Sequence, residues 1–177
     1  MKLSRLERLL LWNQYRILEA LNSPEATYYQ EAREALESGY ELHYDQLVQH
    51  IFPERDGMTA KDSEEVIDIL SMFRALKDGY DAMPSKAGVD DWAVKFSGFD
   101  GNGETRYMAY ARFYCKGDGG RFTELHGGHD DFNSHAPTLD RYRRQLQAWR
   151  ASATPYQLTA ADVRRIAAEA VHPTMRP

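Results

Sequence analysis

The segment from Arg121 to His135 holds the densest group of side chains in this sequence that can do chemistry. Imidazole and carboxylate groups are ligands for zinc and manganese, and five of them fall within ten residues: His126, His129, Asp130, Asp131 and His135. The short gap between His126 and His129 would let both side chains reach one ion from a turn. The sequence thus raises the hypothesis of a metal site on His126, His129 and His135, against the plainer interpretation of a solvated loop.

A second chemistry uses the same segment. Arg121 precedes His126 with four residues between them, a spacing that also occurs in helical metal-independent ribonucleases, where a histidine moves protons and an arginine steadies the phosphate. This gives the hypothesis of a metal-dependent or ribonuclease-like hydrolase, in which Arg121 holds phosphate and the catalytic groups are His126, His129, Asp131 and His135. Gly127 and Gly128 interrupt the segment and weigh against it. Whether the protein is an enzyme stays open.

A glycine-rich turn running into an aromatic helix is the most structured part of the sequence. It begins at Ser97 and contains glycines at 98, 101 and 103. Asp100 is expected to cap the following helix by accepting a hydrogen bond from its first amides. Four residues then recur at helical spacing, which predicts that they share one buried or contact face: Tyr107, Tyr110, Ala111 and Tyr114.

Helical periodicity extends over most of the chain and predicts an all-α fold of six or seven helices. The expected helices cover residues 5–21, 24–38, 40–51, 59–80, 104–115, 138–151 and 160–171. We expect at most one very short strand, at residues 92–96. The helices are expected to form one domain over residues 1–171, with a possible division into halves 1–83 and 91–171 and a loose tail at 172–177.

The first of these helices has apolar residues on nearly all sides. Its main stripe consists of Leu6, Leu9, Leu10, Asn13, Ile17 and Leu21, and further apolar residues cover other sides: Leu11, Trp12, Tyr15 and Leu18. So little polar surface implies burial in a core or against another copy of the chain. Asn13 is therefore expected to be buried and hydrogen-bonded, fixing the register of the helix or contacting a ligand. The pattern predicts a homo-oligomer.

Composition and charge narrow the classes of partner. The chain has 177 residues and a formal net charge of −5, with no apolar run long enough to span a membrane. Acidic residues dominate the first half, and four arginines of the helix at 138–151 point in different directions (Arg141, Arg143, Arg144 and Arg150), so nucleic-acid binding is not expected. One cysteine, Cys115, and the absence of a secretory signal predict a cytoplasmic protein. No cofactor is expected.

Three segments together resemble the YfbU family of bacterial proteins. They are residues 8–18, the turn at residues 98–100, and residues 132–133 with the helix that follows. The matching signature positions are Asn13, Gln14, Tyr15, Gly98, Phe99, Asp100, Phe132 and Asn133. The resemblance implies a mostly helical fold without an agreed biochemical activity and brings no catalytic residues, and the histidines at 126, 129 and 135 depart from the family pattern. The favoured hypothesis is a non-catalytic cytoplasmic interaction or regulatory protein acting as a homo-oligomer, with a second protein as another partner class.

Overall fold

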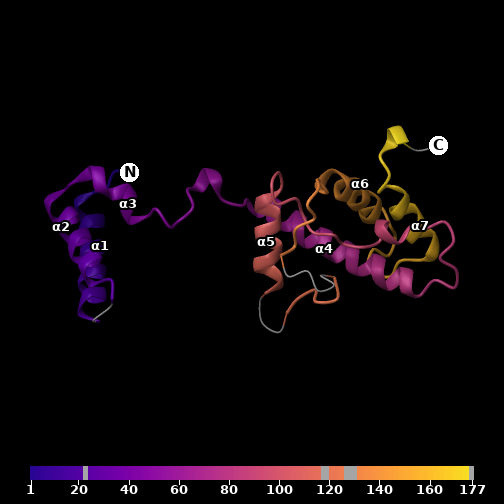
Figure 1. Cartoon of the computed structure of the whole chain (residues 1–177), viewed down its shortest axis with the longest axis horizontal. Coiled ribbons are helices and arrows are strands. Elements are labelled where there is room, and N and C mark those ends of the chain that lie inside the picture. The colour runs from indigo at the N-terminus through magenta and orange to yellow at the C-terminus, as the bar shows by residue number, and fades with distance from the viewer. Residues whose placement is uncertain (22–23, 117–119, 126–130, 176–177) are drawn as a thin grey trace. The chain divides into compact units, whose positions relative to one another are not determined.

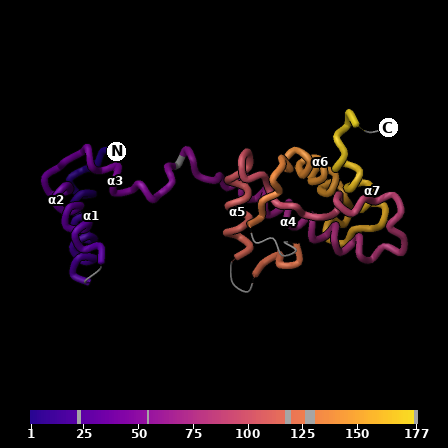
Figure 2. Tube along the Cα trace, in the orientation of Figure 1, coloured from indigo at the N-terminus to yellow at the C-terminus, as the bar shows by residue number. Residues whose placement is uncertain are grey.

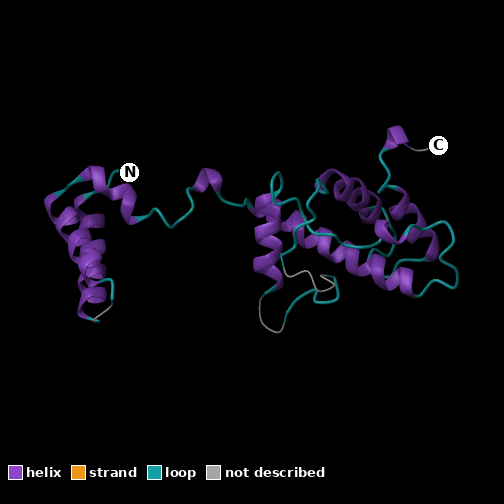
Figure 3. Ribbon diagram, viewed as in Figure 1, coloured by secondary structure: helices purple, strands orange, loops and turns teal. Residues whose placement is uncertain are grey.

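The fold of this chain is all-α, as the periodicity predicts. A computed structural model describes residues 1–21, 24–116, 120–125 and 131–175. These residues form seven α-helices and four short 3₁₀ helices, and no sheet (Figure 3). The segment at 92–96 contains no strand, because Asp91–Ala93 is a 3₁₀ helix. By its internal contacts the chain divides into two units, Met1–Gly57 and Met58–Pro177.

The first unit is built on two long helices that lie side by side, α1 (Arg5–Ala20) and α2 (Ala26–Ser38) (Figure 2). Ser4 and Glu7 form a capping box at the start of α1. Gly39 ends α2 with a φ of 75°, a left-handed conformation that glycine adopts without strain. The 3₁₀ helix Glu41–His43 leads into α3 (Tyr44–Leu47), which is shorter than the helix expected over 40–51, and a second 3₁₀ helix covers Glu54–Asp56.

A small apolar core joins these helices. Three side chains on the inner face of α1, and Leu3 just before it, pack on four buried residues. The three are Leu11, Trp12 and Tyr15, and the buried residues are Ala32, Leu36, Tyr44 and Leu47. Two polar contacts fasten α1 to α2: Arg8 donates to the Leu36 carbonyl at 3.0 Å, and Arg33 pairs with Glu19 at 2.9 Å. The unit therefore uses only one side of α1.

The opposite side of α1 is exposed. No residue of the helix is fully buried, and the exposed side chains include the apolar residues of the main stripe, Leu6, Leu9, Leu10, Ile17 and Leu21, together with Leu18 from another side. Asn13 is exposed within the single chain as well, so the core of this unit does not bury it, and its burial against another copy stays a prediction. The reason is that α2 packs on the side of α1 that carries Leu11, Trp12 and Tyr15.

The second unit is organised around α4 (Ala60–Asp81), on which α5 (Thr105–Cys115), α6 (Leu139–Arg150) and α7 (Ala160–Ala168) all pack (Figure 1). The apolar stripe of α4 is completely buried at Val66, Ile69, Leu70, Phe73 and Leu76, and Tyr80 is half-buried. Thr159 and Asp162 form a capping box at the start of α7. A 3₁₀ helix at Pro173–Met175 follows.

The core of the second unit includes residues from both sides of the loop at 84–90. Met83, Val89, Ala93 and Val94 are buried together with α4. Internal contacts divide the chain between Gly57 and Met58. Two expectations stay predictions: the possible division into halves 1–83 and 91–171, and the loose tail at 172–177. None of the helices in the described part of the chain is long and apolar enough to cross a membrane.

Candidate functional site

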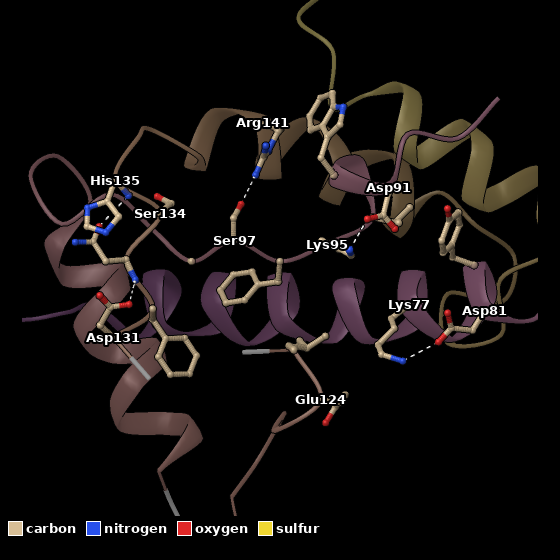
Figure 4. Close-up of a pocket in the computed structure, with 18 of the residues that line it drawn as sticks. Lys77, Asp81, Asp91, Lys95, Ser97, Glu124, Asp131, Ser134, His135 and Arg141 are labelled. Carbon is tan, nitrogen blue, oxygen red and sulfur yellow. Dashed lines mark hydrogen bonds and ion pairs between the residues drawn. The ribbon is translucent and has the colours of Figure 1, made fainter. Parts of the chain in front are cut away.

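A groove of about 850 Å³ in the second unit is the candidate functional site (Figure 4). Figure 4 shows its lining spread along α4, from Lys77 and Asp81 at one end to Asp131 and His135 at the other. The segment at residues 91–98 forms a second wall, and α6 contributes Arg141. We call this site the α4 groove.

Two signature segments that lie far apart in the sequence meet at the wall of the groove. Phe99 and Asn133 form an isolated parallel bridge, in which the Phe99 amide donates to the Phe132 carbonyl at 2.9 Å and the Ser134 amide donates to the Phe99 carbonyl at 3.0 Å. Gly98 permits this approach: its φ is +89°, and a Cβ there would lie 2.2 Å from the Phe132 carbonyl oxygen. Five of the eight signature positions are thereby brought together.

Asn133 holds the two segments through its side chain. Its side-chain Oδ1 accepts from the backbone amides of Gly101 and His135, each at 3.0 Å. Its backbone amide donates to Asp131 Oδ1 at 3.1 Å. Phe132 and His135 have a φ of 55°, a conformation that costs a non-glycine residue free energy and that often marks ligand sites.

The carboxylates of the glycine-rich turn do not act as the sequence predicts. Asp100 is buried and accepts from the amides of Asn102 and Gly103 at 3.2 and 3.1 Å, so it closes the turn; the expectation that it caps the next helix is wrong, because α5 begins only at Thr105. Glu104 does the capping, and it caps a different helix. Its carboxylate accepts from the Thr138 amide and hydroxyl, both at 2.9 Å, and from the Leu139 amide at 2.7 Å, at the start of α6.

Most carboxylates of the α4 groove are matched by a cation. Asp81 pairs with Lys77 at 2.7 Å, Asp91 pairs with Lys95, and Glu124 pairs with Arg74 at 2.5 Å. Lys77 lowers the pKa of the Asp81 carboxyl chiefly through their hydrogen bond. The fourth carboxylate, Asp131, receives the amide of Asn133.

Two cations of the groove have no such partner. Among the described residues no carboxylate lies within 4.0 Å of the basic nitrogens of Arg141 or Lys86. Arg141 donates to Ser97 Oγ at 2.8 Å, and its guanidinium carbon lies 5.5 Å from the centre of the Trp92 ring. The Lys86 ammonium lies 4.5 Å from the centre of the Tyr80 ring. The groove therefore places an aromatic ring beside each of these two cations, while its described lining as a whole holds as many carboxylates as Lys and Arg side chains.

Only part of the predicted histidine cluster can be placed. His126, His129 and Asp130 lie outside the described residues. Asp131 and His135 line the groove, whereas Arg121 lies outside its lining and stacks on Tyr114, with its guanidinium carbon 4.8 Å from the ring centre. In the part of the chain that the structure describes, no three His, Cys, Asp or Glu residues are grouped as metal ligands would be.

The other three signature positions belong to the first unit. Asn13 and Gln14 are exposed on α1. Tyr15 packs on Tyr28 and Tyr29, with ring centres 6.2 and 5.9 Å away, and burial raises the pKa of its hydroxyl to about 12.

Sequence reasoning missed the aromatic and basic residues of the groove. The sequence suggests only a short strand for the segment with Trp92 and Phe96, and it gives Arg141 no role beyond that of the other arginines of its helix. Two of those arginines, Arg143 and Arg150, form ion pairs with Glu65 and Asp68 of α4. The one sequence signal that Arg141 lies near the core was its position next to Tyr142. Tyr142 is fully buried, and its ring centre lies 5.0 Å from the Arg141 guanidinium carbon.

Comparison with known proteins confirms the family resemblance. The YfbU domain model matches residues 1–169. A UPF0304 protein of the archaeon Methanocaldococcus jannaschii is 38% identical over 152 residues, which cover 83% of this chain and 87% of that protein. Because this relative is archaeal, the family extends beyond bacteria. The match over nearly the whole chain shows that the protein belongs to the YfbU family.

Proposed function

We propose that this YfbU protein is a non-catalytic cytoplasmic interaction or regulatory protein that acts as a homodimer, with α1 of one copy packed against α1 of the other. The observation that carries the proposal is the exposed apolar side of α1. Soluble proteins rarely leave a contiguous apolar surface of this kind open, and burying one Leu or Ile contributes about 1.5–3 kcal/mol. The single cysteine, buried and without a second cysteine to pair with, supports a reducing compartment.

The order of residues along α1 supports a second copy of the chain as the partner that covers its exposed apolar side. The exposed apolar residues are placed symmetrically about the midpoint between Asn13 and Gln14: Leu10 with Ile17, Leu9 with Leu18, and Leu6 with Leu21. Two identical helices that pack antiparallel about a two-fold axis bring together residues placed in this way. Each apolar side chain of one copy then meets an apolar side chain of the other.

Polar residues support the same arrangement. Asn13 of one helix would meet Gln14 of the other on both sides of the axis, and two amide side chains can exchange hydrogen bonds there and fix the register. The exposed cations Lys2 and Arg5 lie before α1, or in its first turn, and Glu25 lies just beyond its end. An antiparallel pair sets the basic start of one helix beside the acidic end of the other.

The mass of the protein tests this proposal. We expect a dimer by light scattering at micromolar concentration, and a monomer when Leu10→Glu and Ile17→Glu are combined, because the pair places four charges inside the interface. The control is Leu42→Glu, at a residue that is 85% exposed in the same unit but outside α1. It should stay dimeric, and circular dichroism should show all three proteins equally helical.

Cross-linking tests the antiparallel register. Leu10→Cys and Ile17→Cys proteins, when mixed and oxidised, should form a disulfide with each other, and Leu10→Cys alone should do so far less, because its equivalent lies about 10 Å along the helix at 1.5 Å per residue. A wild-type monomer overturns the dimer and leaves the exposed side of α1 to another partner. Efficient cross-linking of Leu10→Cys with itself overturns only the antiparallel register.

The alternative function, a metal-dependent or ribonuclease-like hydrolase on residues 121–135, is favoured by one observation: Asp131 and His135 face the α4 groove. Its test is the metal content and nuclease activity of the wild type and of His129→Ala and His135→Ala. If both variants match the wild type in both measurements, the hydrolase is excluded.

A further inference from the structure

The strongest unassigned feature of this protein is the basic and aromatic part of the α4 groove. Arg141 projects from α6 toward Ser97, as Figure 4 shows, and only one of its nitrogens, Nη2, is engaged there. A guanidinium carries five N–H donors in a planar fork that fits a carboxylate, sulfonate or phosphate. Arg141 thus has donors left for an anion.

Three of the four carboxylates in the described lining of the groove are paired with a cation. Asp81, Asp91 and Glu124 are paired with Lys77, Lys95 and Arg74. Asp131 lies beside His135 at the far end of the view in Figure 4, away from Arg141. Among the described residues no carboxylate lies within 4.0 Å of the Arg141 guanidinium, so an anion that reaches it displaces no described ion pair.

Aromatic surface lies next to the same cation. Trp92 is 47% exposed, which is unusual for the largest apolar side chain, and its ring lies beside the Arg141 guanidinium. Phe96 is half-buried in the groove and packs on Phe73 and Tyr142, with ring centres 5.6 and 5.7 Å away. A ligand ring can therefore lie against Trp92 or Phe96 while its charged group reaches Arg141.

From this juxtaposition we propose that the α4 groove binds a small aromatic acid, with the anion held by Arg141 and the aromatic ring against Trp92. The volume of about 850 Å³ is in the range of small-molecule sites. The bridge between Phe99 and Asn133 anchors the end of the segment that carries Trp92 and Phe96. This site lies within the second unit and does not depend on the proposed dimer of α1.

Two dyes that share an aromatic body separate the role of the charge from that of the ring. The probes are 8-anilinonaphthalene-1-sulfonate, an aromatic anion, and N-phenyl-1-naphthylamine, which lacks the sulfonate. Fluorescence titration of the full chain should give saturable binding of the anionic dye at one site per chain. Arg141→Gln should weaken the anionic dye about tenfold, as expected for the loss of a charge-assisted contact, and leave the neutral dye unchanged.

Matched variants complete the test. Arg150→Gln makes the same substitution on the same helix, where the arginine pairs with Asp68, and should change neither affinity. Trp92→Ala should weaken both dyes, and the combined Leu10→Glu and Ile17→Glu variant should bind both as the wild type does, because its changes lie in the first unit. Absence of a saturable site, an equal effect of Arg141→Gln on the two dyes, or an equal effect of Arg150→Gln overturns the proposal.

Discussion

The thiol of Cys115 illustrates how packing sets the chemistry of a single residue. It lies on the inner side of α5 and is 4% exposed. Burial raises its pKa to about 11, with a smaller contribution in the same direction from the nearby Glu124 carboxylate. At neutral pH the group is therefore a protonated, apolar part of the core.

This pKa gives a prediction about reactivity and stability. The native thiol should react very slowly with an aromatic disulfide reagent at pH 8 and stoichiometrically in denaturant, because only the thiolate attacks. An acid whose pKa is raised by folding loses protons first in the unfolded state, so the free energy of unfolding should fall as pH rises from about 9 toward 11. Fast labelling of the native protein at pH 8 would contradict this account.

At the scale of single residues, a contact is readable from the sequence where the partner is local. The capping boxes at Ser4 and Thr159 are defined by side chains three residues apart, which the sequence displays directly. The role of Glu104 is not readable in this way, because its partners Thr138 and Leu139 lie at the start of another helix. Asp100 was assigned the capping role because only nearby amides can be considered without a structure.

Among the elements, α6 depends most on a residue outside itself. Thr138 precedes the helix but makes no side-chain cap, and the carboxylate of Glu104 takes its place. That carboxylate also accepts from the Asp100 amide at 2.9 Å, so it ties the glycine-rich turn, the start of α5 and the start of α6 together.

Glu104→Gln should therefore destabilise the second unit. The amide keeps one acceptor oxygen and turns an NH₂ group toward backbone donors, so we expect a loss of about 2 kcal/mol in the free energy of unfolding, measured with urea. Glu64→Gln, at an exposed position on α4, is the matched control and should change it by less than about 0.5 kcal/mol. Equal effects of the two substitutions would remove the capping role.

The helices themselves were predictable, but the side of α1 that faces the core was not. Periodicity correctly placed α1, α4, α6 and α7, because each repeats apolar residues every three or four positions. On α1 two apolar stripes compete, and the one with Leu11, Trp12 and Tyr15 packs on α2. The α4 groove could not be predicted, because it forms only when residues 91–98, 131–135 and Arg141 meet.

For the molecule as a whole, the two units differ greatly in the size of their cores. The first unit buries only a few apolar residues together, whereas the second buries a continuous core that includes α4, α5, α6 and α7. Small cores rarely supply enough free energy to fold unaided. The second unit is thus expected to be the independently stable part of the protein.

A fragment of residues 58–177 should reveal this independence. We expect it to be helical, to unfold in one cooperative transition, and to keep the dye-binding site of the α4 groove, because every residue that lines the groove lies within it. Circular dichroism during thermal unfolding is the measurement, with the full chain as reference. A fragment without a cooperative transition would mean that the first unit is needed for the second to fold.

The approach of Gly98 to the Phe132 carbonyl limits how this protein can change during evolution. A side chain at position 98 would clash with the backbone of Phe132. A clash with a side chain can be relieved by a smaller residue at the other position, but a clash with backbone cannot. Glycine can be replaced there only if the path of residues 132–133 changes as well. One of the two segments precedes α5 in the sequence and the other follows it, and they have to change together. Exchanging either one alone between diverged relatives should yield a chimaera in which the two segments do not meet and the wall of the α4 groove does not form.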